Sequence, residues 1–209
     1  MKRLLLSATI IVLAMGNSYA QKARDVFSLG IKVGSNYSNV FDSQGDKFVA
    51  EGKYGLAAGA FLSLPIGKII GIQPEVIYSE KGFKATGSFL GSNYSATRTT
   101  TYIDVPILLA VKPTNFLTVL AGPQYSFLIK QNNNFTSTLA SADRDKIFDN
   151  DNIRKNVLGL IGGVDINLSS FVIGARVGVD VQNNNGDGSS TTPRYKNAWY
   201  QATIGFRLF

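Results

Sequence analysis

Histidine and cysteine are both absent from the 209 residues, and each absence excludes several kinds of site. Without histidine the chain cannot build a Ser-His-Asp triad, a Cys-His pair or almost any zinc site. Without cysteine it has neither disulfides nor a lipid-modified cysteine, so a closed sheet or a large core must stabilise the fold. Because no motif places serine, lysine and aspartate in catalytic relation, we predict no catalytic residue, no cofactor and no metal.

The first 20 residues have the pattern of a secretory signal peptide. Lys2 and Arg3 form a basic start, and the apolar segment from Leu4 to Met15 is too short for a spanning helix, which needs about 20 residues. Small residues around Ala20 are typical of a cleavage site. We therefore expect residues 1–20 to be removed and residues 21–209 to form one domain.

The net charge of +7 includes Lys2 and Arg3, so the remaining chain carries +5. Nucleic acid is excluded as a partner, because no basic stretch is interleaved with aromatic residues and because the chain is expected to be exported. A modest positive charge is compatible with contact with anionic lipid headgroups. The expected partners are outer-membrane lipids and a protein that binds from outside the cell.

The rest of the chain alternates between large apolar residues and small or polar ones, which is the two-residue period of β-strands. From Phe27 to Tyr37, for example, the odd positions are mostly apolar, whereas the even positions are Ser, Gly, Lys, Gly and Asn. A uniformly apolar face is suited to hydrocarbon, and a glycine-rich face with isolated charges is suited to a narrow lumen. The segments with this pattern are 27–37, 54–64, 70–79, 102–112, 117–130, 157–168, 171–181 and 199–208.

The connections between these eight segments alternate strictly between long and short. The long ones are 38–53, 80–101, 131–156 and 182–198, and the short ones are 65–68, 113–115 and 169–170. Outer-membrane barrels have short periplasmic turns, longer extracellular loops and both termini in the periplasm. The sequence therefore predicts an all-β fold, an eight-stranded antiparallel up-and-down transmembrane β-barrel that crosses the outer membrane many times.

Aromatic residues gather at the two ends of the predicted strands. Phenylalanines at 27, 116, 171 and 206 fall near the periplasmic ends, as expected for an interfacial girdle. A second set falls near the extracellular ends, and we expect it to form the outer rim: Tyr37, Tyr54, Tyr78, Tyr102, Tyr125, Trp199 and Tyr200.

Charged residues on the inward register are the main candidates for a functional site, and they are Lys32, Glu75, Asp104, Lys112, Lys130, Asp165, Arg176, Asp180 and Arg207. They could line a permeation pathway. An eight-stranded barrel, however, is only wide enough inside for side chains, so buried charges must be paired. We therefore predict a plugged lumen in which Glu75, Asp104, Asp165 and Asp180 pair with Lys32, Arg176 and Arg207. Arg176 is expected to bridge carboxylates of adjacent strands.

Several segments resemble the PorT-like outer-membrane β-barrel family over essentially the whole mature chain. They include residues 73–82 (QPEVIYSEKG), 102–106 (YIDVP), 121–123 (AGP), 174–176 (GAR) and the terminal 205–209 (GFRLF). The resemblance implies an eight-stranded barrel. Some members of that family are linked to protein secretion or gliding machinery, so a secretion role is implied only as an alternative.

Two roles therefore remain open. The first is a non-enzymatic barrel that acts through its long extracellular loops as a structural or interaction module. The second is a narrow pore or a component of a secretion apparatus.

Two local features are also ambiguous. Residues 183–188 (NNNGDG) match the start of a calcium-binding loop, but Arg194 stands where that loop needs a bidentate glutamate, so ordinary turn chemistry is the favoured interpretation. Strict alternation also turns Phe209 inward, although terminal phenylalanines of outer-membrane barrels usually face lipid. A terminal bulge would reconcile the two.

Overall fold

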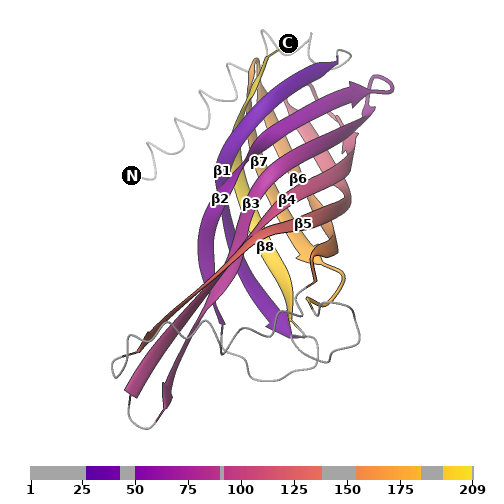
Figure 1. Ribbon diagram of the computed structural model, residues 1–209. Coiled ribbons are helices and arrows are strands. Elements are labelled where there is room, and N and C mark those ends of the chain that lie inside the picture. The colour runs from indigo at the N-terminus through magenta and orange to yellow at the C-terminus, as the bar shows by residue number, and fades with distance from the viewer. Residues whose placement is uncertain (1–26, 43–49, 90–91, 138–153, 185–194, 209) are drawn as a thin grey trace, which may run out of the picture.

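The protein forms a closed barrel of eight antiparallel strands, as seen in a computed structural model (Figure 1). The structure describes residues 27–42, 50–89, 92–137, 154–184 and 195–208. The strands are β1 (Ser28–Asp42), β2 (Ala50–Pro65), β3 (Ile70–Phe89), β4 (Ser92–Val111), β5 (Leu117–Ser137), β6 (Asn156–Leu168), β7 (Phe171–Asp180) and β8 (Tyr195–Arg207). No helix within these ranges is long and apolar enough to cross a membrane.

Each strand pairs with its neighbours in sequence, and β8 closes the barrel by pairing with β1. Closure leaves no open sheet edge along the barrel wall, which suits a wall in contact with lipid. All eight predicted strands are present, and the predicted fold class is confirmed.

The two faces of the barrel wall follow the predicted alternation. In β7 every second residue is buried, from Val172 to Asp180, and the residues between them are exposed and mostly apolar. Outside, large apolar side chains such as Val33 and Ile107 are more than half exposed, as a lipid-facing wall requires. Inside, glycines alternate with polar and charged side chains.

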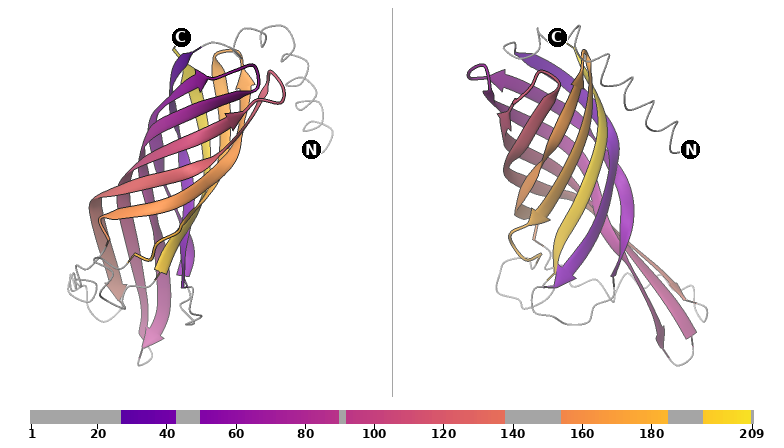
Figure 2. Two further views of the ribbon diagram at one scale, coloured as in Figure 1. Left: turned by 90° about the vertical axis from the view of Figure 1, so that its right-hand side faces the viewer. Right: turned by 180° about the vertical axis from the view of Figure 1, so that it is seen from behind.

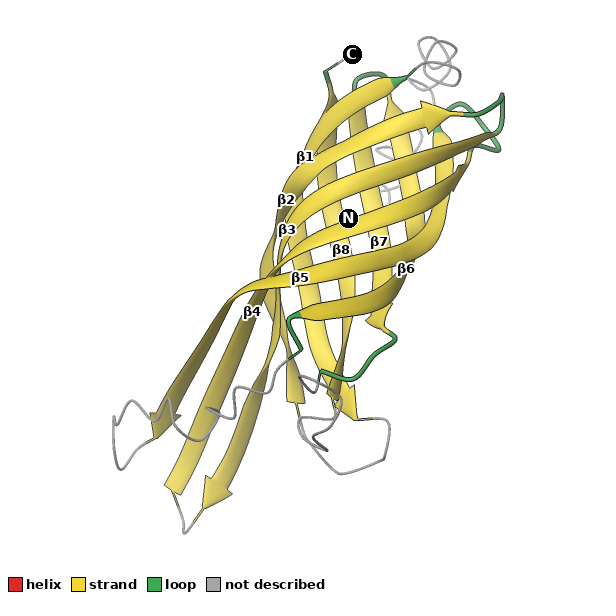
Figure 3. Ribbon diagram, turned by 45° about the vertical axis from the view of Figure 1, so that its right-hand side comes forward, coloured by secondary structure: helices red, strands yellow, loops and turns green. Residues whose placement is uncertain are grey.

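Three strands continue far beyond the rest of the barrel at the end away from the C-terminus (Figures 2 and 3). The β3–β4 ladder runs from Ile70↔Val111 to Phe89↔Ser92, and β5 stays paired with β4 as far as Ser137. We call the part formed by residues 80–89, 92–101 and 128–137 the blade. The prediction that residues 80–101 form a loop is therefore wrong, because nearly all of them lie in β3 and β4.

Gly82 lies where β3 leaves the barrel and enters the blade. Its φ of 149° lies in a region that residues with a Cβ rarely adopt, and a Cβ there would come within 2.0 Å of the Arg98 carbonyl oxygen. The Gly82 N–H and carbonyl both bond the Ser38 hydroxyl of β1, at 2.8 and 3.0 Å. Because β2 lies between β1 and β3 in the sheet, these hydrogen bonds attach the base of the blade to β1, the strand beyond β2.

Candidate functional site

The middle of the lumen contains a buried cluster of four charges from four strands. Lys32 of β1 forms an ion pair with Glu75 of β3. Arg176 of β7 places Nη1 2.7 Å from Asp165 Oδ1 on β6 and Nη2 3.6 Å from Glu75 Oε1. Because β3 and β7 are not neighbours in the sheet, the Arg176–Glu75 contact spans the lumen.

Gln73 completes this cluster, which we call the central cluster. Its Nε2 donates to Glu75 Oε1 at 2.9 Å and to Asp165 Oδ2 at 3.2 Å. Arg176 Nη1 also donates to the Val164 carbonyl oxygen at 2.8 Å. Two cations thus neutralise two carboxylates, and the further hydrogen bonds add protein groups around these buried ions, although Arg176 Nε and Nη2 have no hydrogen-bond partner among the described residues.

A second cluster lies nearer the blade and is centred on Lys81 of β3. Its Nζ is 2.9 Å from Asp104 Oδ2, 3.8 Å from the centre of the Trp199 ring and 5.1 Å from that of Tyr102. An ammonium group over aromatic faces gains cation–π attraction in addition to its ion pair. Gly178 makes room for the indole, since a Cβ there would lie 2.2 Å from the Trp199 ring.

The other inward charges are held by neutral partners. Asp180 accepts hydrogen bonds from the Asn197 side chain and backbone N–H, and Arg207 donates to Asn167 and to the Ser169 carbonyl oxygen. Lys112 Nζ donates to Ser63 Oγ at 3.3 Å. The structure therefore brings Lys32, Glu75, Asp165 and Arg176 together as predicted. The rest of the predicted pairing is wrong, because Asp104 pairs with Lys81 whereas Asp180 and Arg207 bond neutral groups.

Neutral side chains fill the remaining interior. Leu108, Ala110, Leu120, Ile161 and Trp199 form a buried apolar cluster inside the barrel. Between the charged groups, Asn36 of β1 links β3 to β8 by donating to Ser79 and accepting from Gln201. Side chains therefore occupy the lumen at successive levels, as expected for an interior of eight strands.

Lys130 was predicted to face inward, and this prediction is wrong, because its side chain is exposed on the outer face. Tyr102 lies opposite Leu128, but Thr101 lies opposite Lys130, so β5 has one additional residue at this point. Such a bulge reverses the alternation of every residue that follows it. Strict alternation therefore places Lys130 on the wrong face.

The outward tyrosines form a ring near the blade end of the barrel, which we call the aromatic ring. Tyr37 lies opposite both Tyr54 and Tyr200, and the Tyr37 and Tyr54 rings are 4.9 Å apart. Tyr78 and Phe127 both lie opposite Ile103 of β4, and Phe127 contacts Tyr125 at 4.9 Å.

Tyr102 and Trp199, which were predicted as part of this rim, instead face the lumen. Each is 1% exposed. They lie on the inward register of β4 and β8, where they contact Lys81 rather than the membrane boundary. The interpretation of these two residues as interfacial anchors is therefore wrong, whereas the other five rim tyrosines lie on the outer or half-exposed face.

Lys81 is an inward charge that was not predicted from the sequence. Its side chain is 1% exposed and forms an ion pair with Asp104. Asp104 was expected to pair with Lys32, Arg176 or Arg207 instead. The signal was present, because Gln73, Glu75, Ile77, Ser79 and Lys81 continue one alternation. Only the assumption that β3 ends at residue 79 excluded it.

Three predictions concern residues outside the described ranges: the leader, the register of Phe209 and the calcium-like loop. Residues 1–26 and 209 lie outside the described residues, and so do positions 185–188 and 194 of the calcium-like loop. Among the residues that the structure describes, no group of three or more acidic side chains is arranged to hold a metal ion.

The comparisons with known proteins agree with this geometry. The family model for the outer membrane protein beta-barrel domain matches residues 19–181. The chain belongs to that family. This membership supports an outer-membrane location for the barrel but does not distinguish the PorT-like branch. No curated protein matches the chain.

Several solved outer-membrane barrels are similar to this chain at low sequence identity. One is Ail, the attachment invasion locus protein of Yersinia pestis, solved with the heparin analogue sucrose octasulfate, at 12% identity and a TM-score of 0.46, covering 87% of this chain and 99% of that one. Neisserial surface protein A shows 11% identity and a TM-score of 0.42 over 87% and 99% of the two chains. OprG of Pseudomonas aeruginosa shows 14% identity and a TM-score of 0.43 over 88% and 97%.

Proposed function

We propose that this outer-membrane barrel is a closed, non-enzymatic anchor that presents the blade to a partner protein outside the cell. The observation that carries the proposal is the blade itself, a three-stranded sheet that continues from the barrel wall (Figure 3). A filled lumen supports an anchoring role, because buried ion pairs and apolar side chains occupy the space that a pathway or substrate would need.

The free edge of β5 makes the blade suitable for binding a polypeptide. The β5–β6 ladder ends at Phe127↔Asn156, and one further bond joins the Leu128 N–H to the Lys155 carbonyl. Beyond it, residues 129–137 pair with β4 on one side only, as far as the described residues show. Unpaired backbone N–H and C=O groups along such an edge are a template for an added strand.

The composition of this edge is consistent with binding rather than protection. Natural edges are commonly protected by charges, prolines or bulges. The edge has one charge, Lys130 at its start; beyond it, residues 131–137 (QNNNFTS) contain no charge and no proline, and the single bulge of β5 lies before them. The partner we propose is therefore a segment in extended conformation that adds to β5 through its main chain.

A narrow pore or a component of a PorT-like secretion apparatus is the second candidate. It is favoured by the resemblance of residues 73–82 and 102–106 to that family. Both candidates would use the same barrel, but only the first requires the outer edge of β5.

Proline substitutions along β5 test the first candidate. Successive residues of a strand direct their N–H groups to opposite sides, so Asn132→Pro and Asn133→Pro remove donors on different edges. One of the two blocks the outer edge and leaves the β4 ladder intact. Since the natural chain has no cysteine, Asn134→Cys provides a single attachment point for a cross-linker on intact cells.

We expect Asn134→Cys to give one discrete cross-linked partner, identified by mass spectrometry, and the edge-blocking proline to abolish it. Asn132→Ser is the matched control, because it changes the side chain but keeps the backbone donor. Val33→Cys on the lipid-facing wall reports nonspecific capture. Equal capture by the proline variants and the control would exclude strand addition.

A further inference from the structure

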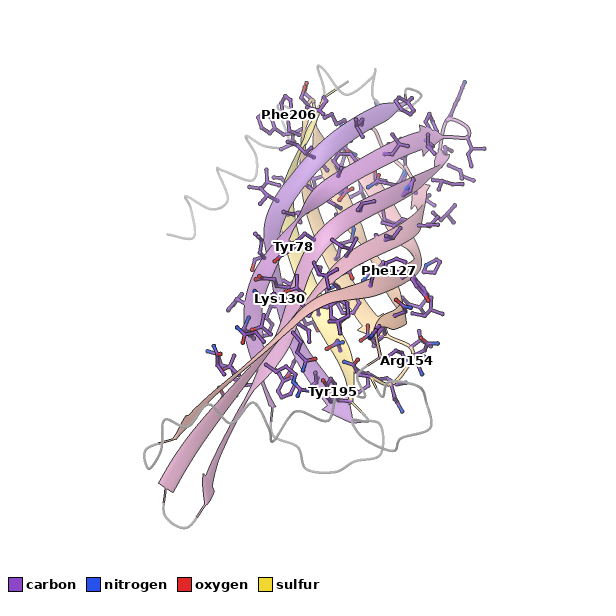
Figure 4. All side chains as sticks on the ribbon, viewed as in Figure 1. Tyr78, Phe127, Lys130, Arg154, Tyr195 and Phe206 are labelled. Carbon is purple, nitrogen blue, oxygen red and sulfur yellow. The ribbon has the colours of Figure 1, made fainter. Side chains whose placement is uncertain are left out.

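Four exposed or partly exposed lysines lie beyond the aromatic ring, toward the blade, and we call them the lysine collar. They are Lys84 of β3, Lys130 of β5, Lys155 just before β6 and Lys196 of β8. Lys84, Lys130 and Lys155 are exposed and Lys196 is partly exposed. Figure 4 shows Lys130 farther toward the blade than Tyr78 and Phe127, with Phe206 near the opposite end.

The register places all four lysines on the blade side of the ring. Lys155 immediately precedes Asn156, the partner of Phe127, and Lys130 follows Phe127 on β5. Lys196 lies opposite Phe41, and this pair is four residues along each strand beyond the Tyr37↔Tyr200 pair. Lys84 continues β3 beyond Tyr78. Aromatic residues mark the membrane boundary, so the collar lies at the level of the outer-leaflet headgroups.

Within the part of the chain that the structure describes, no ion pair neutralises the collar lysines. None has a carboxylate within 4.0 Å among the described residues. Glu51 lies opposite Lys84 without forming an ion pair, and Glu80 is engaged by the Leu56 N–H at 3.2 Å and the Tyr78 hydroxyl at 3.4 Å. Among the described residues, the four lysines are therefore free of ion pairs at this level.

We propose that the lysine collar binds phosphate groups of outer-leaflet lipid headgroups. Lysine is a point charge suited to phosphate, and each lysine near an anionic surface contributes about 1 kcal/mol, or about a fivefold change in affinity. The lysines are spread over β3, β5, β8 and the residue before β6 rather than gathered on one side. A distribution around the wall fits the lipids that surround a barrel better than one soluble polyanion. This inference does not depend on the function proposed for the blade.

Lipid retention by the refolded protein tests the inference. The protein is incorporated into phosphatidylcholine vesicles that contain either diphosphoryl or monophosphoryl lipid A, extracted in mild detergent and examined by native mass spectrometry. The main variant replaces all four collar lysines by glutamine, and Lys196→Gln is compared with Lys68→Gln. Lys68 is an exposed lysine in the turn at the other end of the barrel. Heat-dependent gel mobility checks that each variant is folded.

We expect the protein to retain more diphosphoryl than monophosphoryl lipid A, and the fourfold variant to lose this retention by at least about tenfold. Lys196→Gln should reduce it and Lys68→Gln should not. Equal retention by the natural protein and the fourfold variant would overturn the proposal. So would displacement of the lipid by inorganic phosphate at millimolar concentration, because the site would then recognise a soluble anion rather than a headgroup.

Discussion

Replacing Arg176 by methionine removes the cation that joins three strands in the central cluster. The natural side chain is 1% exposed and reaches Asp165 of β6 at 2.7 Å and Glu75 of β3 at 3.6 Å. Methionine fills a similar length but donates no hydrogen bond. Glu75 retains Lys32 and Gln73 as partners, whereas the only hydrogen bond that Asp165 retains among the described residues comes from Gln73 Nε2, at 3.2 Å.

The expected loss follows from the burial of Asp165. Removing one partner of a buried ion pair costs about 3–5 kcal/mol, because the other charge is left uncompensated. With a urea dependence of about 1–3 kcal/mol per molar, the unfolding midpoint should fall by about 2 M. A second change, Asp165→Asn, removes the orphaned charge and should restore part of the loss.

Urea titrations of the refolded protein in detergent, followed by tryptophan fluorescence and by gel mobility, measure these shifts. Lys84→Met is the matched control, because it removes an exposed cation without an ion-pair partner and should leave the midpoint almost unchanged. If Arg176→Met is as stable as the natural protein, the lumen is hydrated at this level. The description of a plugged barrel would then be wrong.

Three further predictions concern the wall, the second cluster and the leader. Val33→Arg, deep in the lipid-facing wall, should destabilise by about 2–4 kcal/mol, whereas Val177→Arg, level with the aromatic ring, should cost about 0–1 kcal/mol in the same urea titration. Lys81→Met should lower stability by about 3–5 kcal/mol by leaving a buried carboxylate unpaired, and it should change the emission of Trp199, the only tryptophan. Equal costs for the two arginines, or unchanged emission, would contradict the assigned positions. Mass spectrometry of the protein from outer membranes should find Gln21 at the N-terminus, and recovery of an intact leader would refute cleavage.

The sequence was sufficient to predict the barrel because lipid imposes a strict requirement on every spanning residue. An outward position in hydrocarbon must be apolar, so segments such as 171–181 show an alternation that few other folds produce. The inward positions of Glu75, Asp165 and Arg176 follow from the same alternation.

The blade could not be predicted in this way, because neither of its faces lies in hydrocarbon. The segments 92–101 and 131–137 are polar on both registers, and a strand with two polar faces has no periodic signal. The bulge before Lys130 was missed for another reason: Phe127, Leu128 and Ile129 are all apolar, so the run does not show where the alternation shifts. Tyr102 and Trp199 show a different limit: an amphipathic ring can occupy a membrane boundary or cover a buried ammonium group.

Planar-bilayer conductance of the refolded mature protein tests the closed barrel most directly. The ion pairs of Lys32, Glu75, Asp165 and Arg176 span the lumen, and apolar side chains lie beside them. We expect no stepwise current from the natural protein at moderate voltage, and openings only in variants that break the central cluster, such as Arg176→Met. Stable unitary currents from the natural protein would contradict the closed barrel and would favour the pore.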